Sequence, residues 1–309
     1  MEELKLPLSE SVVSIIGMGL MGGSLGMALF KGGFCKEVRG VVREESQALA
    51  VVAAKAAHVA GTDRKRLLGE ADLVVLATPV CSIEEEILSI QPFLRSGSVL
   101  TDLGSTKASI VNAMDKLEGD IIAVGGHPMC GKETSGIGSA TSILFEGALW
   151  ALIPTRNTRP HGLELLLELI SVVGARPAVM DVERHDSAVA CVSTLPYLFS
   201  VALMAVVSEA GQDNEFVREL ASSGLRDTSR LAASNIRMMK EIIDSNRGHV
   251  QRILSMSLQR LEDLGHLLTN KDTKGLCDFL KNAKEERLRL FPEGVPEAIH
   301  GPGAPRGRG

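Results

Sequence analysis

Short apolar runs alternate with helix-forming segments along the first half of the chain. The runs are rich in β-branched residues and span 11–16, 38–42, 73–77, 99–102 and 121–124. Segments rich in Ala, Leu and Glu lie between them, for example 45–57 and 83–90. Fully apolar strands separated by helices are typical of a parallel sheet covered on both faces. The pattern therefore predicts the α/β fold class, with a doubly wound parallel sheet.

The pattern changes near residue 182. Two further strands are expected at 150–154 and 176–180, on either side of a Leu-rich helix at 162–173. Only helical spacing follows, in the segments 183–210, 214–222, 231–244 and 247–268.

A length of 309 residues suits two domains. We place an α/β domain at 1–182 and an all-helical domain at 183–291. The stretch 292–309 is rich in Pro and Gly, and we expect it to be a flexible tail.

Charge and cysteine content exclude some kinds of binding partner and indicate the cellular compartment. The chain has 33 Lys and Arg against 38 Asp and Glu, and this net charge of -5 gives no positive field for nucleic acid. Its five cysteines have neither CxxC pairs nor zinc-ligand spacing, which indicates a reducing compartment and no metal site. The first residues lack the basic and apolar regions of a signal peptide. We therefore expect a cytoplasmic protein.

One segment, 187–208, has no charged residue and is long enough to cross a bilayer. Pro196 lies within it, and no basic flank orients it. A single apolar helix with such flanks is more often buried inside a protein. We interpret the segment as a core or subunit-interface helix and expect no membrane span.

A GxGxxG motif follows the first strand at once and opens a helix at 24–30. Its residues are Gly17, Met18, Gly19, Leu20, Met21 and Gly22. In this context the glycines permit a tight turn, the approach of a pyrophosphate and close packing of helix and strand. The motif predicts dinucleotide binding.

The end of the second strand bears on the type of dinucleotide. Proteins that bind NAD usually place an acidic residue there, whereas this chain has Val42 and Arg43. A cation suits the 2′-phosphate of NADP. The alternative is that Arg43 is solvated and that Glu44 or Glu45 binds the ribose of NAD. We expect NADP, with NAD as the alternative.

Three more strand ends carry polar residues that are expected at the ligand-binding edge of the sheet. Thr78 and Pro79 end one strand, and Ser105 follows another, although turn chemistry alone also explains these types. His127 follows the strand at 121–124 and could accept a proton from an alcohol, because its pKa lies near neutral pH. The alternative is a structural histidine.

Ionisable residues also lie at helix starts in the second half. Arg226 and Arg230 belong to such a stretch, where caps or surface positions are the default. An Arg fork matches a carboxylate with two bonds, so either one could hold an anionic substrate if the domains close over it.

Together these motifs resemble the prephenate/arogenate dehydrogenase family of tyrosine biosynthesis, over about 11–289. Beside the glycine turn, the resemblance rests on DLGS at 102–105, HPMCG at 127–131 with Glu133 and Gly136, ERHD at 183–186 and GLRDTSRLA at 224–232. It implies an enzyme that oxidatively decarboxylates a cyclohexadienol to a phenol.

The resemblance also implies roles. His127 would assist deprotonation of the ring hydroxyl, Ser105 would place that hydroxyl, and His185 and Arg230 would hold the substrate from the helical domain. That domain would form a homodimer. Two departures from the family concern the substrate pocket. Where the family often has Ser-His-Leu-Pro-His, this chain has Ser-Thr-Leu-Pro-Tyr at 193–197, and where the family commonly has a Trp, this chain has Met239.

The substrate would be arogenate or prephenate, which differ in an ammonium and a keto group. Glu133 could pair with the ammonium, so we expect arogenate. Two alternatives are a β-hydroxyacid-type dehydrogenase and a non-catalytic dinucleotide sensor. The first relies on a Lys that 183–210 lacks, and the second need not keep His127, Ser105 and Arg230 together.

Overall fold

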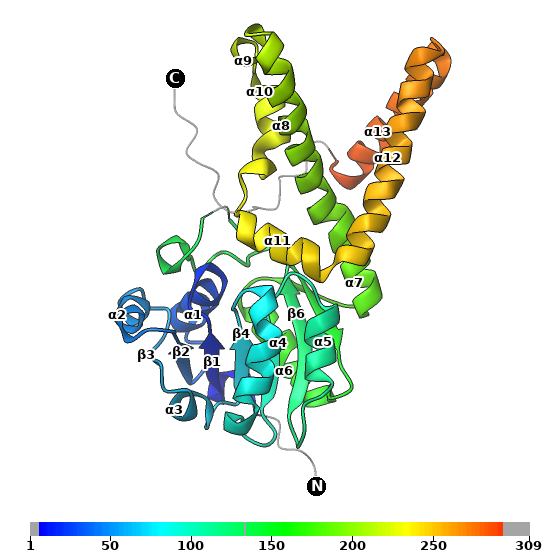
Figure 1. The fold of residues 1–309 in the computed structure, drawn as a ribbon. Coiled ribbons are helices and arrows are strands. Elements are labelled where there is room, and N and C mark those ends of the chain that lie inside the picture. Colours follow the sequence, from blue (N-terminus) through cyan, green and yellow to red (C-terminus); the bar gives the residue numbers. More distant parts are fainter. Residues whose placement is uncertain (1–5, 133, 293–309) are drawn as a thin grey trace.

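The protein consists of an α/β half with a helical half standing on one edge of its sheet (Figure 1). The computed structural model describes residues 6–132 and 134–292. The predicted substrate residue Glu133 and residues 293–309 of the predicted tail lie outside the described residues.

The α/β half contains one sheet of eight strands in the order β3-β2-β1-β4-β5-β6-β7-β8. The strands are β1 (Val12–Ile16), β2 (Glu37–Val41), β3 (Val59–Gly61), β4 (Leu73–Leu76), β5 (Val99–Asp102), β6 (Ile122–Pro128), β7 (Leu149–Pro154) and β8 (Arg176–Val179). From β1 the chain adds strands first on one side and then on the other, which is the doubly wound arrangement. The predicted fold class is confirmed.

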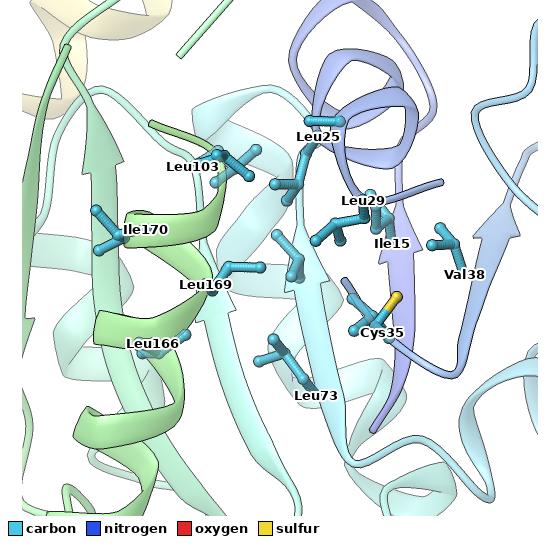
Figure 2. Packing of buried hydrophobic residues seen from close by; sticks show 14 of the residues in the cluster. Ile15, Leu25, Leu29, Cys35, Val38, Leu73, Leu103, Leu166, Leu169 and Ile170 are labelled. Atoms are coloured by element: carbon cyan, nitrogen blue, oxygen red, sulfur yellow. The ribbon is translucent and has the colours of Figure 1, made fainter. Parts of the chain in front are cut away.

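Helices cover both faces of the sheet. They are α1 (Leu20–Gly32), α2 (Glu45–Ala53), α3 (Arg64–Leu68), α4 (Val80–Ile90), α5 (Ala108–Met114) and α6 (Pro160–Val172). Leu25 and Leu29 of α1 share one core cluster with Leu169 of α6, as Figure 2 shows. Ile87 of α4 and Met114 of α5 belong to a second cluster on the opposite face. The central strands β1, β4, β5 and β6 are largely apolar because each contributes side chains to both clusters.

Two features of the sheet differ from the prediction. The strand β3 was not expected, because it has only three half-buried residues. The strand β7 pairs antiparallel to β6, although all other pairs are parallel. Among the described residues of the connection at 129–148, η3 (Ile137–Ser139) is the only helical element, and it is too short to carry the chain back to the opposite edge before β7 begins.

The connection at 129–148 therefore stays at the carboxyl edge of the sheet. Its Thr141 N–H donates to Ser24 Oγ of α1 at 3.0 Å. A Cβ added at Gly23 would lie 2.5 Å from Ile137 Cδ1. The connection thus packs on the first turns of the helix that the glycine motif opens.

The helical half begins at Val182, after the last strand ends at Val179. Its elements are α7 (Val182–Val189), the π-helical turn η4 (Ala190–Thr194), α8 (Leu195–Asp213), α9 (Phe216–Glu219), α10 (Ser223–Ser229), η5 (Arg230–Ala233), α11 (Ile236–Ser245), α12 (Arg247–Thr269) and α13 (Thr273–Leu290). Two arms diverge from α7 and α11, one made by α8 to α10 and the other by α12 and α13 (Figure 1).

The apolar segment interpreted as a core or interface helix lies within a continuous helix, Val182–Asp213. By length and composition this helix passes the test for a membrane span, and 22% of its most apolar window is buried within the chain. Ser200 is the one buried residue of α8. Within this chain α8 is therefore not a core helix, because most of its apolar side chains are exposed, and the interface alternative stays a prediction.

A buried ion pair joins the turn after β5 to β6. Lys107 Nζ contacts the Asp102 carboxylate and donates to the carbonyl of Gly126 at 2.8 Å. The carboxylate also accepts from the N–H groups of Gly104 at 2.7 Å and Gly126 at 2.9 Å. Both charged side chains are fully buried. This network fixes the turn against the strand one residue before His127.

We expect Lys107→Met to lower the free energy of unfolding by about 3–5 kcal/mol, because the variant leaves the Asp102 carboxylate buried without a counter-ion. Chemical denaturation followed by circular dichroism measures this change. The matched control is Lys240→Met, which removes an exposed lysine that pairs with Asp244 at 2.7 Å. The control should leave the unfolding midpoint nearly unchanged. Equal small effects in both variants would contradict a stabilising role for the buried pair.

Candidate active site

The glycine motif forms the turn between β1 and α1. Gly17 has φ +94°, and a Cβ there would lie 2.8 Å from the carbonyl carbon of Ala77. A Cβ at Gly22 would lie 2.2 Å from the Gly17 carbonyl oxygen. No atom lies within 4 Å of a Cβ built at Gly19, which is the N-cap of α1. The turn is closed at its first and last glycine and open at the middle one.

This arrangement fits a dinucleotide. The first N–H groups of a helix have no partner within it, and they attract a phosphate that approaches over Gly19. The side chain of Met18 is buried in the core, so this residue contributes only its backbone to the turn. Leu20 and Met21, the first residues of α1, are half-buried and pack against the same core.

Thr78 and Pro79 follow β4 beside this turn. Thr78 Oγ1 is buried and has no hydrogen-bond partner within the described part of the chain. The neighbouring Cγ2 atom lies 3.0 Å from the position of a Cβ at Gly17. Pro79 is exposed and is the N-cap residue of α4. A buried hydroxyl without a partner is costly, and a bound ligand at this turn would satisfy it.

The end of β2 presents Arg43 to solvent. Glu44 is the N-cap residue of α2. The Glu45 carboxylate accepts hydrogen bonds from Thr62, from Oγ1 at 2.6 Å and from the N–H at 2.9 Å. These bonds lower the pKa of Glu45. Of the two acidic residues, Glu45 is thus already hydrogen-bonded to the loop that follows β3.

His127 and His185 meet at the carboxyl edge of the sheet. His127 belongs to β6, His185 belongs to α7, and both are buried, with exposed fractions of 8% and 2%. His127 Nδ1 lies 2.9 Å from His185 Nε2. His185 Nδ1 lies 2.8 Å from Asp186 Oδ1. Both nitrogens of His185 are therefore engaged with protein groups.

Asp186 joins the two halves of the molecule. Its carboxylate accepts from the N–H groups of Lys107 at 2.8 Å and Ala108 at 2.9 Å, at the start of α5. Asn246 Nδ2 donates to the Asp186 carbonyl at 2.7 Å. A second link joins Thr106 Oγ1 to Ser245 Oγ at 2.8 Å. The histidine pair thus lies where the helical half is attached.

Burial, the Lys107 ammonium and His185 together hold the pKa of His127 well below its ordinary value. Burial is the largest cause because it disfavours the charged imidazolium. At neutral pH the imidazole is consequently unprotonated, which is the state of a proton acceptor.

Two other predicted site residues, Ser105 and Arg230, lie in turns outside the histidine pair. Ser105 is half-buried in the turn between Asp102 and Lys107. The exposed Arg230 begins η5, which packs against α8. The roles expected for both residues stay predictions, as does that of Glu133.

Sequence reasoning assigned no role to Lys107 or Asp186, although Asp186 ends the ERHD motif and Lys107 closely follows the DLGS motif. A charged residue is rarely fully buried unless it is paired. Neither residue carries a sequence signal for burial. Burial depends on contacts between distant segments, such as the bond between the Lys107 N–H and Asp186, which are 79 positions apart.

Comparison with known proteins assigns the chain to a family. The model "Prephenate dehydrogenase, nucleotide-binding domain" matches residues 25–179, and "Prephenate dehydrogenase, dimerization domain" matches residues 181–282. Prephenate dehydrogenase of Bacillus subtilis is 27% identical over 298 residues, which cover 94% of this chain and 80% of the relative.

Two solved structures are similar over nearly the whole chain. Arogenate dehydrogenase of Synechocystis is 29% identical with a TM-score of 0.81, covering 91% of this chain and 100% of that one. Prephenate dehydrogenase of A. aeolicus, in complex with hydroxyphenyl propionate and NAD+, is 27% identical with a TM-score of 0.85, covering 92% and 99%. The resemblance seen in the motifs is confirmed, and the chain belongs to the prephenate dehydrogenase family.

Proposed function

We propose that this protein oxidatively decarboxylates a cyclohexadienol to a phenol, in tyrosine biosynthesis, with a nicotinamide dinucleotide as oxidant. The observation that carries this proposal is His127, a buried and unprotonated imidazole at the same sheet edge as the glycine turn. Membership of the prephenate dehydrogenase family supports it.

Each proposed residue has one task. The glycine turn, with Thr78 and Pro79, would hold the dinucleotide, which supplies a hydride acceptor when bound. His127 takes the proton of the ring hydroxyl as the ring carbon loses hydride, and loss of CO2 makes the ring aromatic. Ser105 places the hydroxyl. Arg230 binds a substrate carboxylate from the helical half.

The substrate we favour is arogenate. A carboxylate at Glu133 would pair with its ammonium group, whereas the keto group of prephenate offers no such partner. The solved relatives include one named for each substrate, so the family supports either reaction.

The cofactor we favour is NADP, with NAD as the alternative. Arg43 is exposed at the end of β2, where a 2′-phosphate would lie. The carboxylate of Glu45 is engaged by Thr62 and is thus a poorer partner for a ribose hydroxyl. The A. aeolicus relative was solved with NAD+, so both dinucleotides belong in the test.

We expect His127→Asn to lower kcat by about 10²- to 10⁴-fold, because the hydroxyl proton then has no acceptor. The dissociation constant of the dinucleotide should stay unchanged. Stopped-flow absorbance of the reduced nicotinamide and equilibrium titration measure the two quantities. The control His266→Asn replaces an exposed histidine of α12 and should behave as the wild type. Full activity of His127→Asn would contradict the role of a base.

The low pKa of His127 fixes the sign of the pH dependence. His127, faced by Lys107 and by His185, whose other ring nitrogen contacts Asp186, must be unprotonated to act. The wild-type kcat should therefore stay level as the pH falls through about 6.5, the ordinary histidine value, and decline only at lower pH. A decline centred at 6.5 or above would contradict this environment.

We expect kcat/KM to be higher with NADP than with NAD, and higher with arogenate than with prephenate. The assay measures reduced nicotinamide with all four pairs. Arg43→Ala should raise KM for NADP and spare NAD, whereas Arg156→Ala, which removes an exposed arginine elsewhere, should change neither. A preference for NAD or for prephenate would overturn that part of the proposal. Binding of dinucleotide without turnover of either substrate would indicate a sensor.

We propose a cytoplasmic homodimer, and the helical half supports the dimer. Val192, Phe199 and Val206 are exposed seven residues apart along one continuous helix. A second exposed stripe on α12 has intervals of four, three and seven residues, at Leu254, Leu258, Leu261 and Leu268. Such spacing is typical of helices that pack against a partner. The family domain matched here is a dimerization domain.

Leu261→Arg should convert the dimer, of twice 32.9 kDa, into monomers, because it buries a charge in the proposed seam. Light scattering coupled to gel filtration measures the mass. The matched control is Leu49→Arg on α2, which replaces a leucine that is 79% exposed and lies far from either stripe. A wild-type protein that is monomeric at micromolar concentration would refute the dimer.

A further inference from the structure

We propose that Asp186 and His185 are positioning residues that keep the proton of His127 on Nδ1, so that Nε2 is free to accept the substrate proton. The inference rests on the proposed function for its consequence in catalysis. Its structural basis is the chain of contacts from the Asp186 carboxylate through His185 to His127.

The first step is the Asp186 carboxylate. Oδ1 faces the N–H of Lys107 and His185 Nδ1, both at 2.8 Å, and Oδ2 faces the N–H of Ala108 at 2.9 Å. An ionised carboxylate only accepts hydrogen bonds, and two of these neighbours are backbone donors. The third neighbour, His185 Nδ1, must therefore carry a proton to donate.

The second step follows from the tautomers of a neutral imidazole, which has one N–H and one bare nitrogen. With its proton on Nδ1, His185 presents a bare Nε2 to His127 Nδ1 at 2.9 Å. That contact is a hydrogen bond only if His127 Nδ1 carries the proton. The rings meet at an interplanar angle of 71°, and their centroids are 5.1 Å apart.

The third step concerns the remaining nitrogen. His127 Nε2 has no hydrogen bond to any described residue, and it is not among the buried polar atoms that lack a partner. It is thus accessible to a ligand. The contacts behind His127 leave its lone pair on this nitrogen, which is the nitrogen that a substrate hydroxyl can reach.

The same chain offsets the charge that catalysis creates. When the hydroxyl proton reaches Nε2, His127 becomes an imidazolium whose Nδ1–H still points at His185. A shift of that proton to His185 Nε2 would place the cation directly beside the Asp186 carboxylate, with no proton gained or lost by the protein. Burial makes such stabilisation stronger than it is in water.

Two variants test the inference. Asp186→Ala removes the acceptor of the His185 Nδ1–H, so the proton of His185 is no longer held on Nδ1 and the opposite tautomer becomes available. His185→Phe cuts the chain but keeps the Asp186 bonds to α5. Each should lower kcat by about 10²- to 10⁴-fold, the range for loss of a correctly protonated base. In His185→Phe, which keeps the attachment of the two halves, KM for the cyclohexadienol and the dissociation constant of the dinucleotide should change less than threefold.

The matched control is Asp181→Ala. Asp181 is the N-cap of the same helix, and its carboxylate accepts from the Arg184 N–H at 2.8 Å. Its backbone carbonyl accepts from the His185 N–H at 3.1 Å, a bond that alanine keeps, and no described contact joins its side chain to a histidine ring. Its removal should leave kcat and the histidine tautomers unchanged. If Asp186 served only to cap α5, His185→Phe would retain the wild-type kcat. If His185 instead held the substrate, His185→Phe would raise KM more than it lowered kcat.

The tautomers of the two histidines can also be measured directly, without substrate. Long-range ¹H–¹⁵N correlation spectra of the full-length protein identify the protonated nitrogen of each imidazole, with assignments from His127→Asn and His185→Phe. In the wild type both histidines should be protonated on Nδ1, and in Asp186→Ala both should shift toward Nε2. A wild-type His127 protonated on Nε2 would overturn the inference. The expected tautomers without any turnover of a cyclohexadienol would instead overturn the proposed function.

Discussion

The carboxylate of Asp186 is the interaction on which the rest of the site depends. It is buried, it belongs to the first helix of the helical half, and its acceptor positions are used by α5 and by His185. A buried carboxylate is stable only when such donors replace the water that it loses. The same bonds that make its burial possible attach one half of the molecule to the other. The site is therefore assembled by the docking of the two halves.

Lys107 connects this carboxylate with a second one. Its backbone N–H faces Asp186, while its ammonium contacts Asp102 and the carbonyl before His127. A single residue thus holds the turn after β5, the strand β6 and the helix α7 in one arrangement. It also contributes a positive charge that disfavours a second cation on His127. The residue that fixes the strand thus also helps to lower the pKa of His127, after burial as the largest cause.

Much of the fold was accessible from the sequence because it depends on local patterns. The apolar runs of β1 and β4 and the spacing of the helix at Val80–Ile90 predicted these elements directly. The reversed strand β7 was not accessible, because its direction depends on how the connection at 129–148 packs on α1. The helix at Thr273–Leu290 was also missed, since it lacks a buried face in this chain.

The candidate site also has one part that local sequence patterns predicted and one part that they did not. The glycine turn and His127 were found from spacing and from their places after strands. The pairing of His127 with His185, and the burial of Asp186, arise from contacts between the two halves, and local patterns carry no signal for them. The interpretation of 187–208 as a core or interface helix had the same limit, since hydropathy does not say which surface covers a helix.

The antiparallel strand β7 has one more consequence. It carries Trp150, the single tryptophan of the chain, which is 1% exposed and pairs in register with Pro128, the residue after His127. A Cβ at Gly126 would lie 3.2 Å from its indole Nε1. The indole fluorescence of this protein therefore originates from one place, directly behind the strand that carries His127. Its emission is a built-in optical probe of the packing beneath the imidazole.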